Sequence, residues 1–357
     1  MNKFAPTPTF TPTTTAFCGI DVSAGSLAVA LIAPDRAVAQ REFANTASGH
    51  KALIAWLGKH NAKVRVSLEA TGIYSLDLAL ALDAAAQIEV VVLNPKLVNR
   101  FAQTLRRSKT DAADAAVLAE YSQRMPFTAW QRPGVSQLRL RTLGRYLESL
   151  VVEQASLKNR FSRAQSTATT PRAVLLDLKQ AQAAVLRLLL KMRREAMKLV
   201  EDDEVLRERF ALLVGIPGIA EISALHILSE LVLLAPEMTV RQWVAYSGLD
   251  PVHQVSGTSV HRPSRISRAG NRHLRRALYM PALHPSDEDL SLGTPALAAV
   301  RWDPHIKAFY ESLLARHKSK LQALVAVARK LLHAIYGIFK SRTPYDGSKL
   351  FPQLGAA

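Results

Sequence analysis

Four carboxylates stand where this sequence is expected to pass from one structural element to the next. Asp21 and Glu69 each close an apolar, β-branched-rich run of strand length, and Asp111 and Asp114 open a predicted helix three residues apart, on one face. Hard divalent cations take oxygen ligands and keep coordination positions for water and phosphate. The four acids therefore predict a site for Mg²⁺, or for Mn²⁺, that serves phosphoryl transfer.

Each of these acids, taken alone, also has an ordinary structural explanation. Asp111 would complement the dipole of a helix N-terminus, and Asp21 would cap a turn. The metal site is favoured because all four acids fall within one predicted α/β domain.

The composition indicates a modular protein with a polyanionic partner. The chain has 357 residues, 48% of them apolar, and 46 Lys plus Arg against 29 Asp plus Glu, which gives a net charge of +17. A sequence pI near 10.2 favours nucleic acid as the partner over the alternative of a basic protein that is merely soluble.

The expected location is the cytoplasm of a prokaryote, with the protein associated with the nucleoid. The single cysteine, Cys18, excludes an intrachain disulfide and is expected in the core. No apolar run approaches the length of a membrane span, and the Pro- and Thr-rich residues 1–15 predict a disordered tail and lack the apolar stretch of a signal peptide.

The N-terminal part reads as three strands followed by alternating helices and strands, which is the order of the ribonuclease H-like fold. In that arrangement the ends of the first and fourth strands and a late helix meet at one edge of the sheet, where the four acids would lie. The predicted strands are 17–22, 27–33, 40–44, 64–69 and 88–94, and the predicted helices are 48–59, 74–86, 96–105 and 111–123.

Two basic stretches are predicted to contact nucleic-acid phosphates. In the first, Arg106, Arg107 and Lys109 precede the helix that carries Asp111. An ordinary solvated loop or helix face is the alternative, although such faces usually mix both signs of charge. The second stretch, residues 251–280, holds no acid and six arginines: Arg262, Arg265, Arg268, Arg272, Arg275 and Arg276.

Residues 129–205 predict two long amphipathic helices that form an antiparallel hairpin, with a break at Pro171. The pair is either a spacer that packs on itself or a coiled coil that joins subunits, and the length of the seam favours subunit contact. Gln154 would fill one polar seam position. The apolar seam positions are Leu143, Leu147, Leu150, Leu157, Phe161, Leu178, Val185, Leu189, Met192, Ala196 and Leu199.

The C-terminal region is expected to be mostly α-helical. Residues 212–219, an apolar run interrupted by Pro217 and Gly218, precede a predicted helix over 221–233, as in a helix-hairpin-helix whose glycines admit a phosphate. A tight turn between packed helices that binds nothing is the alternative.

A serine hydroxyl can attack a phosphodiester and form a phosphoserine. Ser256 lies in a hydroxyl-rich loop just before the arginines of the second basic stretch, but chemistry alone does not separate it from Ser259, Ser264 or Ser267. A serine in a Ser-Gly turn is also commonly structural.

Together these segments resemble the DEDD-type insertion-sequence transposases related to the Piv DNA invertase, a family also described as bridge-RNA-guided recombinases. The resemblance covers nearly all of the ordered chain. It is carried, in order, by residues 19–21, 69–74, 94–95, 109–114, 216–219, 248–251, 256–257 and 270–279.

The resemblance implies a RuvC-like domain that holds Mg²⁺ on Asp21, Glu69, Asp111 and Asp114, then a coiled coil, then a transposase domain with Ser256 as nucleophile. It also implies dimers that assemble to a tetramer, double-stranded donor and target DNA, and a noncoding guide RNA. The expected segments are a tail over 1–15, the metal domain over 16–128, the coiled-coil linker over 129–205, the serine domain over 206–345 and a C-terminal tail over 346–357. The Pro/Thr tail and the loose segment 285–295 depart from the family pattern.

The expected activity is cutting and rejoining of DNA by attack of the Ser256 hydroxyl, without ATP, since the sequence has no phosphate-binding Gly-x-x-x-x-Gly-Lys loop. A junction endonuclease that activates water at the same acids is one alternative. A non-catalytic nucleic-acid-binding scaffold with structural acids is another.

Overall fold

The chain divides into two compact units, Met1–Arg132 and Pro133–Ala357. The computed structural model describes residues 15–35, 37–60, 62–70, 74–105, 110–256, 260–279 and 295–350, without the side chains of residues 253–256, 260–263 and 350.

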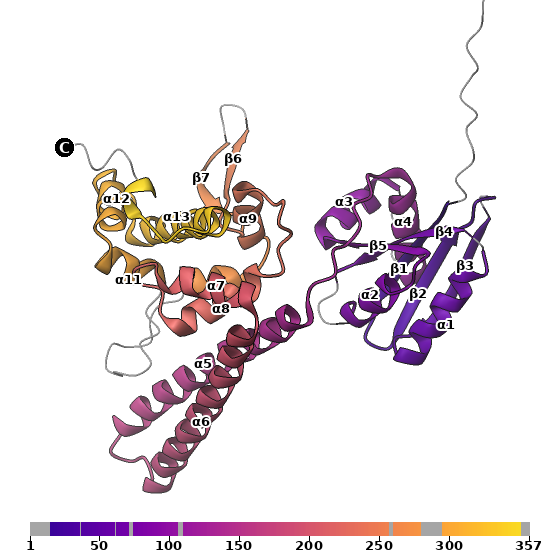
Figure 1. The fold of residues 1–357 in the computed structure, drawn as a ribbon. Helices are drawn as coiled ribbons and strands as arrows, with labels where there is room; N and C mark the ends of the chain where they lie inside the picture. The colour runs from indigo at the N-terminus through magenta and orange to yellow at the C-terminus, as the bar shows by residue number, and fades with distance from the viewer. Residues whose placement is uncertain are drawn as a thin grey trace, which may run out of the picture. The chain divides into compact units, whose positions relative to one another are not determined.

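The N-terminal unit is a five-stranded mixed sheet with helices on both faces (Figure 1). The strand order is β3-β2-β1-β4-β5, in which β1 to β3 are antiparallel neighbours and β4 and β5 run parallel to β1. The predicted element order is confirmed, with ends shifted by at most three residues. The strands are β1 (Thr15–Val22), β2 (Ser26–Ile32), β3 (Val38–Ala44), β4 (Lys63–Glu69) and β5 (Ile88–Leu93), and the helices are α1 (Ala47–Gly58), α2 (Leu76–Asp83), α3 (Pro95–Leu105) and α4 (Asp111–Arg124).

Because side chains alternate along each strand, the two faces of the sheet pack against different helices. Cys18 and Ile20 of β1 pack in a core with Leu53 of α1 and Leu78 of α2. Cys18 is fully buried, as expected, and burial raises the pKa of its thiol far above the usual value. Gly19 and Asp21 lie on the opposite face, which α4 covers.

Helix α4 lies directly on β1, with no side chain between them at Gly19. A Cβ at Gly19 would come within 2.1 Å of Ala115 O and 2.2 Å of Ala119 N. The helix crosses the sheet from β3 to β4. Near its start Gln40 Nε2 donates to the carbonyl of Ala112 (3.5 Å), and near its end Ser122 Oγ donates to the carbonyl of Arg65 (3.1 Å).

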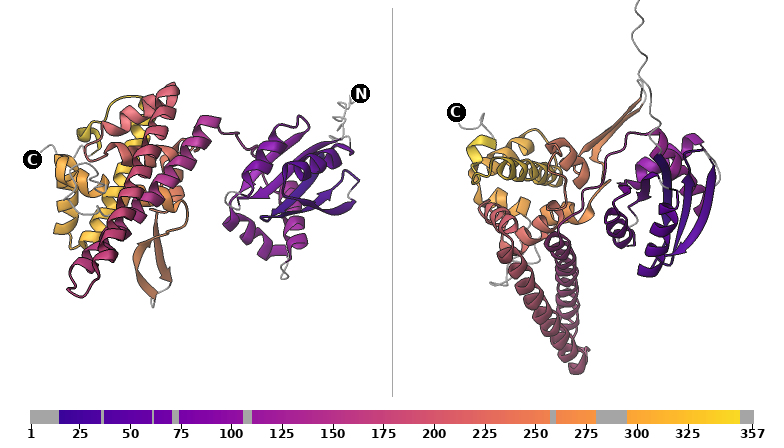
Figure 2. Two further views of the ribbon diagram at one scale, coloured as in Figure 1. Left: turned by 90° about the horizontal axis from the view of Figure 1, so that it is seen from below. Right: turned by 45° about the vertical axis from the view of Figure 1, so that its right-hand side comes forward.

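Where the structure describes the C-terminal unit, it is helical apart from one two-stranded ribbon. Figure 2 shows the long α5–α6 hairpin and this ribbon extending from the helical body. The hydroxyl-rich segment before residue 257, expected as a loop, is part of the ribbon, because β-branched residues such as Val252, Val255 and Val260 favour strands. The elements are α5 (Val135–Gln165), α6 (Arg172–Asp202), α7 (Glu204–Val214), α8 (Glu221–Leu231), α9 (Val240–Ser247), β6 (Pro251–Ser256), β7 (Val260–Ile266), α10 (Arg272–Tyr279), α11 (Pro295–Trp302), α12 (Pro304–Ala315), α13 (Lys320–Ser341) and α14 (Gly347–Leu350), the last within the expected C-terminal tail.

The two long helices pack on each other through the predicted seam. Its buried members include Leu147, Leu157 and Leu189, whereas Val200 is buried in place of Leu199. Gln154, the expected polar position, has a buried Oε1 without a hydrogen-bond partner in the described part of the chain. The seam therefore stabilises the hairpin itself, and its purely apolar character is interrupted once.

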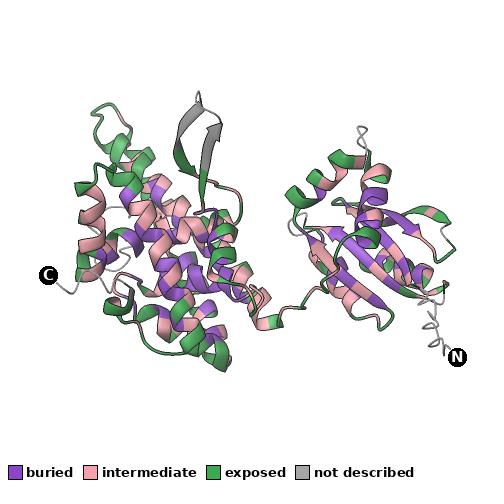
Figure 3. Ribbon diagram, turned by 90° about the horizontal axis from the view of Figure 1, so that it is seen from above, coloured by how far each residue is buried: buried purple, intermediate pink, exposed green. Residues whose placement is uncertain are grey.

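One apolar core joins the hairpin to the helices α7 to α13 (Figure 3). Contrary to the expectation from the sequence, one described helix, α13, is long and apolar enough to cross a membrane by length and composition. Several of its apolar side chains, among them Val327, Leu331 and Ile335, are buried in this core, as in a core helix.

The turn between α7 and α8 packs closely on α11. Gly218 has a φ of 92° and a Cβ there would lie 2.4 Å from the backbone nitrogen of Ala299. Ile216 and Ile219 on either side are buried. Close packing within the unit thus accounts for Gly218, and this favours the tight-turn interpretation of residues 212–219 over phosphate binding at that glycine.

We expect Gly19→Ala to destabilise the N-terminal unit by about 3 kcal/mol, because the added methyl forces α4 away from β1. Hydrogen-exchange mass spectrometry of peptides from β1 measures this loss of protection in the full chain. Gly25→Ala is the matched control, since a Cβ at Gly25 meets no atom within 4 Å. Unchanged protection in the Gly19 variant would contradict the close contact.

Candidate functional site

Asp21 and Glu69 stand at the same end of two adjacent parallel strands. The β1–β4 register pairs Gly19 with Ser67 and Ile20 with Leu68, so the next residues on the two strands, Asp21 and Glu69, follow at the same level. Both lie on the face of the sheet that α4 covers, because side chains alternate and the Cβ direction of Gly19 points to α4. The expected convergence of these two strand ends is present in the backbone.

Asp111 and Asp114 lie in the first turn of α4. The hydroxyl of Thr110 accepts a hydrogen bond from the amide of Ala113 (3.2 Å) and caps the helix. Asp114 immediately precedes Ala115, and the carbonyl of Ala115 lies against Gly19. Gly19 in turn stands two residues before Asp21 on β1. Asp111 is exposed, whereas Asp114 and the two strand acids are partly buried. A capped helix start therefore holds the second pair of acids near the end of β1.

The side chains of the four acids do not form a preassembled metal-binding site. Across the described ranges, which include all four acids, no group of three or more His, Cys, Asp or Glu side chains is placed to hold one metal ion. The backbone frame and the all-oxygen donor set fit a hard divalent cation. The carboxylates would have to turn toward one another to bind it.

The other predicted residues near the acids and in the ribbon are only partly described. Arg106, Arg107 and Lys109 lie outside the described residues, as does Ser259. Ser256 is the last residue of β6 and its backbone pairs with Val260, but neither its side chain nor that of Arg262 is described.

The remaining serine alternatives differ in their surroundings. The hydroxyl of Ser267 donates to the carboxylate of Asp250, so it is occupied in a local turn. Ser264 is exposed near the start of the described side chains of β7. The structure thus gives Ser267 a structural role and leaves the choice among Ser256, Ser259 and Ser264 to experiment.

The arginines of the second basic stretch fall into two groups. Arg265, Arg268 and Arg272 are exposed, as a phosphate contact requires. Arg275 donates to the carbonyl of Ser247 at the end of α9 (2.9 Å), and Arg276 pairs with Glu148 of α5 (3.3 Å). The last two therefore have contacts inside the protein that the sequence did not indicate.

A groove of about 1010 Å³ borders this stretch. Arg265, Arg268 and Arg272 line one side, from β7 to α10, and Lys318 and Arg329 line the other, in the turn before α13 and on α13 itself. None of the described residues that line it is acidic. Lys318 and Arg329 were missed because they lie some 50 residues from the arginine cluster in the sequence, and only the fold brings them opposite it.

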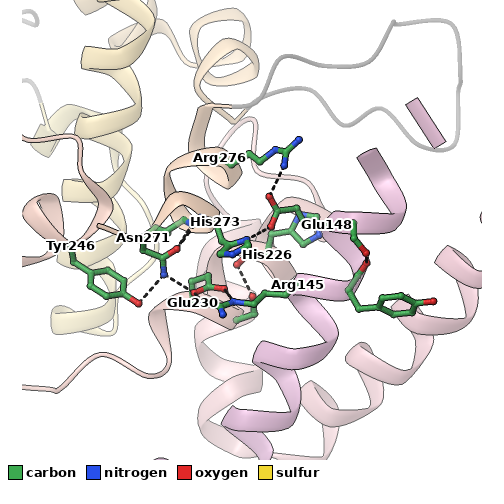
Figure 4. Close-up of polar contacts among 12 residues, drawn as sticks. Arg145, Glu148, His226, Glu230, Tyr246, Asn271, His273 and Arg276 are labelled. Atoms are coloured by element: carbon green, nitrogen blue, oxygen red, sulfur yellow. Dashed lines mark hydrogen bonds and ion pairs between the residues drawn. The ribbon is translucent and has the colours of Figure 1, made fainter. Parts of the chain in front are cut away.

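A buried ionic network holds the start of α10 (Figure 4). Glu230 of α8 is 2% exposed and accepts two hydrogen bonds from Arg145 of α5, at 2.7 and 3.1 Å, and one from Asn271 Nδ2 at 2.6 Å. Asn271 Nδ2 also bonds Tyr246 Oη (2.8 Å), while its Oδ1 accepts from the amides of His273 and Leu274.

Electrostatics keeps Glu230 ionised in this network. Burial alone would raise the pKa of Glu230, but the hydrogen bonds from Arg145 and Asn271 outweigh it and hold the pKa below its usual value. The ionised carboxylate in turn fixes Asn271 as the cap of α10. Asn271 belongs to the stretch 270–279 that carried the resemblance, yet no property of the sequence pairs it with Glu230.

His226 lies next to this network without a hydrogen-bond partner for its Nε2 among the described residues. Burial lowers its pKa to about 4, against smaller opposing effects of Glu148 and Glu230. Glu148 also accepts a hydrogen bond from, or donates one to, His273 Nδ1 at 2.5 Å, depending on protonation. A neutral, buried imidazole therefore packs beneath the arginine-bearing helix.

Comparison with known proteins agrees with both units. Residues 18–166 match a family model for a DEDD transposase of the IS110 type, and residues 211–288 match the transposase IS116/IS110/IS902 family. The pilin gene-inverting protein of Moraxella bovis is 26% identical over 336 residues, 92% of this chain and 97% of the relative.

Two further relatives extend this comparison. The pilin gene-inverting protein of Moraxella lacunata is 26% identical over 310 residues, 85% of this chain and 89% of the relative. An uncharacterised 43.6 kDa protein of insertion element IS110 from Streptomyces coelicolor is 30% identical over 108 residues, 30% of this chain and 23% of the relative.

The mixed sheet, the acids at its strand ends and the first family match define a DNA-processing enzyme whose N-terminal unit has the ribonuclease H-like fold. The chain belongs to the DEDD transposases of the IS110 type and is related to the Piv pilin gene invertases. Transposases and invertases of this family cut and rejoin DNA.

We expect stability to fall between about pH 6.5 and pH 4 because of His226. The unfolded state takes up a proton at the ordinary histidine pKa and the folded state does not, so stability rises with pH across this window and levels off above it. The loss is about 3 kcal/mol for a shift of this size. His226→Gln should show a smaller fall over the same window in urea denaturation followed at a series of pH values; an identical pH profile would contradict the assignment.

Proposed function

We propose that the chain is the transposase of an insertion sequence and that it cuts and rejoins DNA by a metal-dependent, serine-nucleophile mechanism. The observation that carries the proposal is the placement of Asp21 and Glu69 at adjoining strand ends, beside the first turn of α4, in a chain of this transposase family. The proposed domains are 16–128 for the metal domain, 129–205 for the linker and 206–345 for the serine domain.

Asp21, Glu69, Asp111 and Asp114 would hold Mg²⁺ or Mn²⁺. The bound ion would polarise the scissile phosphate and favour the ionised form of the attacking alcohol. Before the metal ion binds, four carboxylates near one sheet edge repel one another. This is consistent with the absence of a preformed metal-binding cluster among the described residues. Binding would convert this repulsion into shared coordination.

Ser256 is the proposed nucleophile. Its oxygen forms a bond to phosphorus, the bond from phosphorus to the 3′ oxygen breaks, and the proton lost by the serine is balanced by the one gained at the 3′ hydroxyl. The phosphoserine ester conserves the free energy of the broken bond, so attack by another 3′ hydroxyl rejoins DNA without ATP. Exposed Arg265, Arg268 and Arg272, together with Arg262, would hold the backbone during this exchange.

The proposed partners are double-stranded donor and target DNA and a noncoding guide RNA of the element. A net charge of +17 supports binding of both nucleic acids, and base pairing by a guide would leave sequence choice outside the side chains. The basic residues Arg106, Arg107, Lys109, Arg275 and Arg276 complete the proposed nucleic-acid surface. The proposed place of action is the nucleoid in the cytoplasm of a prokaryote.

The proposed assembly is a dimer that forms a tetramer, with the α5–α6 hairpin as one contact. On α6, Leu176, Ala183 and Leu190 are exposed and follow one another at intervals of seven residues, which places them on one face. Leu176 and Leu190 are 49% and 40% exposed. An exposed apolar stripe on a hairpin whose inner seam is already filled supports a second helix pair as its partner.

Ser256→Ala should abolish the covalent protein–DNA product while leaving DNA binding intact, because the methyl side chain has no oxygen to esterify. Denaturing gel electrophoresis with labelled DNA, Mg²⁺ and the guide RNA measures the product. Ser264→Ala is the control and should form it at the wild-type level. Trapping by the Ser256 variant would remove this residue from the mechanism, and free cleaved ends without attached protein would indicate an endonuclease.

Asp21→Asn should lower cleavage by at least about 100-fold, because the neutral amide removes one charge from the metal site. Titration calorimetry with Mn²⁺ provides a readout apart from activity and should show weaker binding. Asp35→Asn, in the exposed turn after β2, makes the same chemical change away from the site. Equal Mn²⁺ affinity in both variants would rule out Asp21 as a ligand.

A further inference from the structure

The groove between the α10 arginines and α13 has two chemically different surfaces. Its edges carry cations from both sides, including Arg268, Arg272, Lys318 and Arg329. The surface contributed by α12 and α13 is mainly apolar: Leu313, Leu321, Val325 and Ala326 line it, together with the polar Gln322 and with Arg329 at the edge. Leu321 is 58% exposed, which is unusual for a leucine beside so many charges.

The positive charge of the groove is concentrated. Arg275 already contacts the carbonyl of Ser247, and burial, together with the neighbouring Arg268, lowers its pKa. Arg265, Arg268 and Arg272 are exposed, and Lys318 on the opposite side is exposed as well. A polyanion would relieve the mutual repulsion of these cations and release counterions.

The apolar surface distinguishes between kinds of polyanion. A duplex keeps its bases stacked inside and presents phosphates and groove edges, so it would use the charged edges and leave the apolar surface in water. An unpaired strand turns its bases outward, and these pack on apolar and aromatic side chains while its phosphates reach the cations. Tyr279, at the end of α10, adds an aromatic ring to the lining.

The position of the groove connects it to the proposed chemistry. Pro251 and Ile266, the first and last residues of the ribbon, are paired with each other and line the groove. Ser256 is five residues along β6 from Pro251, a distance of about 17 Å in a strand. A strand cut at Ser256 could therefore reach the groove within a few nucleotides, and strand exchange requires that DNA near the break be unpaired.

We propose that this groove binds an unpaired DNA strand next to the cleavage point, with bases on Leu321, Val325 and Tyr279 and phosphates on the arginines and Lys318. The inference rests on the proposed function in placing the break at Ser256. The groove would then hold a displaced strand during strand exchange, which a duplex-binding surface does not do.

Fluorescence anisotropy of the full chain, with EDTA present, tests the proposal with a labelled oligothymidine, the matching oligouridine and a duplex of the same length. Because the chain is also proposed to bind duplex DNA and a guide RNA, the groove is assessed from the loss of affinity that Leu321→Ser causes for each probe. This loss is expected to be largest for the deoxy strand. An equal loss for the duplex would overturn the proposal, and a larger loss for the ribo strand would overturn the choice of DNA.

Three substitutions separate the two surfaces. Leu321→Ser should weaken single-strand binding about fivefold with an unchanged salt dependence, whereas Arg329→Gln should also lower the slope of log affinity against log salt by about 0.7. Lys307→Gln, the control, removes a charge from α12 outside the groove and should leave single-strand affinity unchanged. Wild-type affinity of both groove variants would overturn the proposal.

The experiment is independent of the serine mechanism. Because the strand is uncut and no metal is present, Ser256→Ala should bind the deoxy strand as the wild type does. If that variant binds normally but still forms the covalent product, the mechanism fails and the groove stands. If the mechanism holds and the groove variants bind normally, the groove assignment alone fails.

Discussion

Helix α4 and strand β1 approach so closely at Gly19 that no side chain can lie between them, and the geometry of the proposed metal site depends on this contact. A Cβ there would overlap the helix backbone at 2.1 Å. The contact fixes the height of α4 above the sheet and, through it, the first turn with Asp111 and Asp114. Since Asp21 follows Gly19 by two residues on the same strand, one missing side chain determines how near the helix acids can come to the strand acids.

The C-terminal unit relies on a different constraint, a buried charge. Ionised Glu230 must be solvated by protein groups, and Arg145, Asn271 and, through Asn271, Tyr246 provide them from three other helices. Removing one partner of such a pair leaves a buried charge uncompensated, at a cost of about 3–5 kcal/mol. The same network sets the N-terminus of α10, so the position of exposed Arg272 in the first turn follows from an interaction centred on a carboxylate that is 2% exposed.

Much of the fold was predictable because its signals are local. The β-branched runs that end at Asp21 and Glu69 specified strands, and the heptad spacing of Leu147, Leu157 and Leu189 specified the hairpin. Pairings between distant residues were not predictable: Arg276 with Glu148, Glu230 with Asn271, and Lys318 and Arg329 opposite the arginine cluster. Such contacts depend on how helices pack, and charge patterns within one segment do not contain that information. For the same reason the sequence assigned phosphate contact equally to Arg272 and to Arg275, whose surroundings differ.

The burial of Cys18 gives this protein a practical property. Its thiol is enclosed by the sheet core and stays protonated, so maleimide and methanethiosulfonate reagents have no accessible native target in the folded chain. A cysteine introduced at an exposed position of either unit would therefore react selectively. Pairs of spin labels or fluorophores attached in this way can report the separation of the two units in solution, with and without nucleic acid.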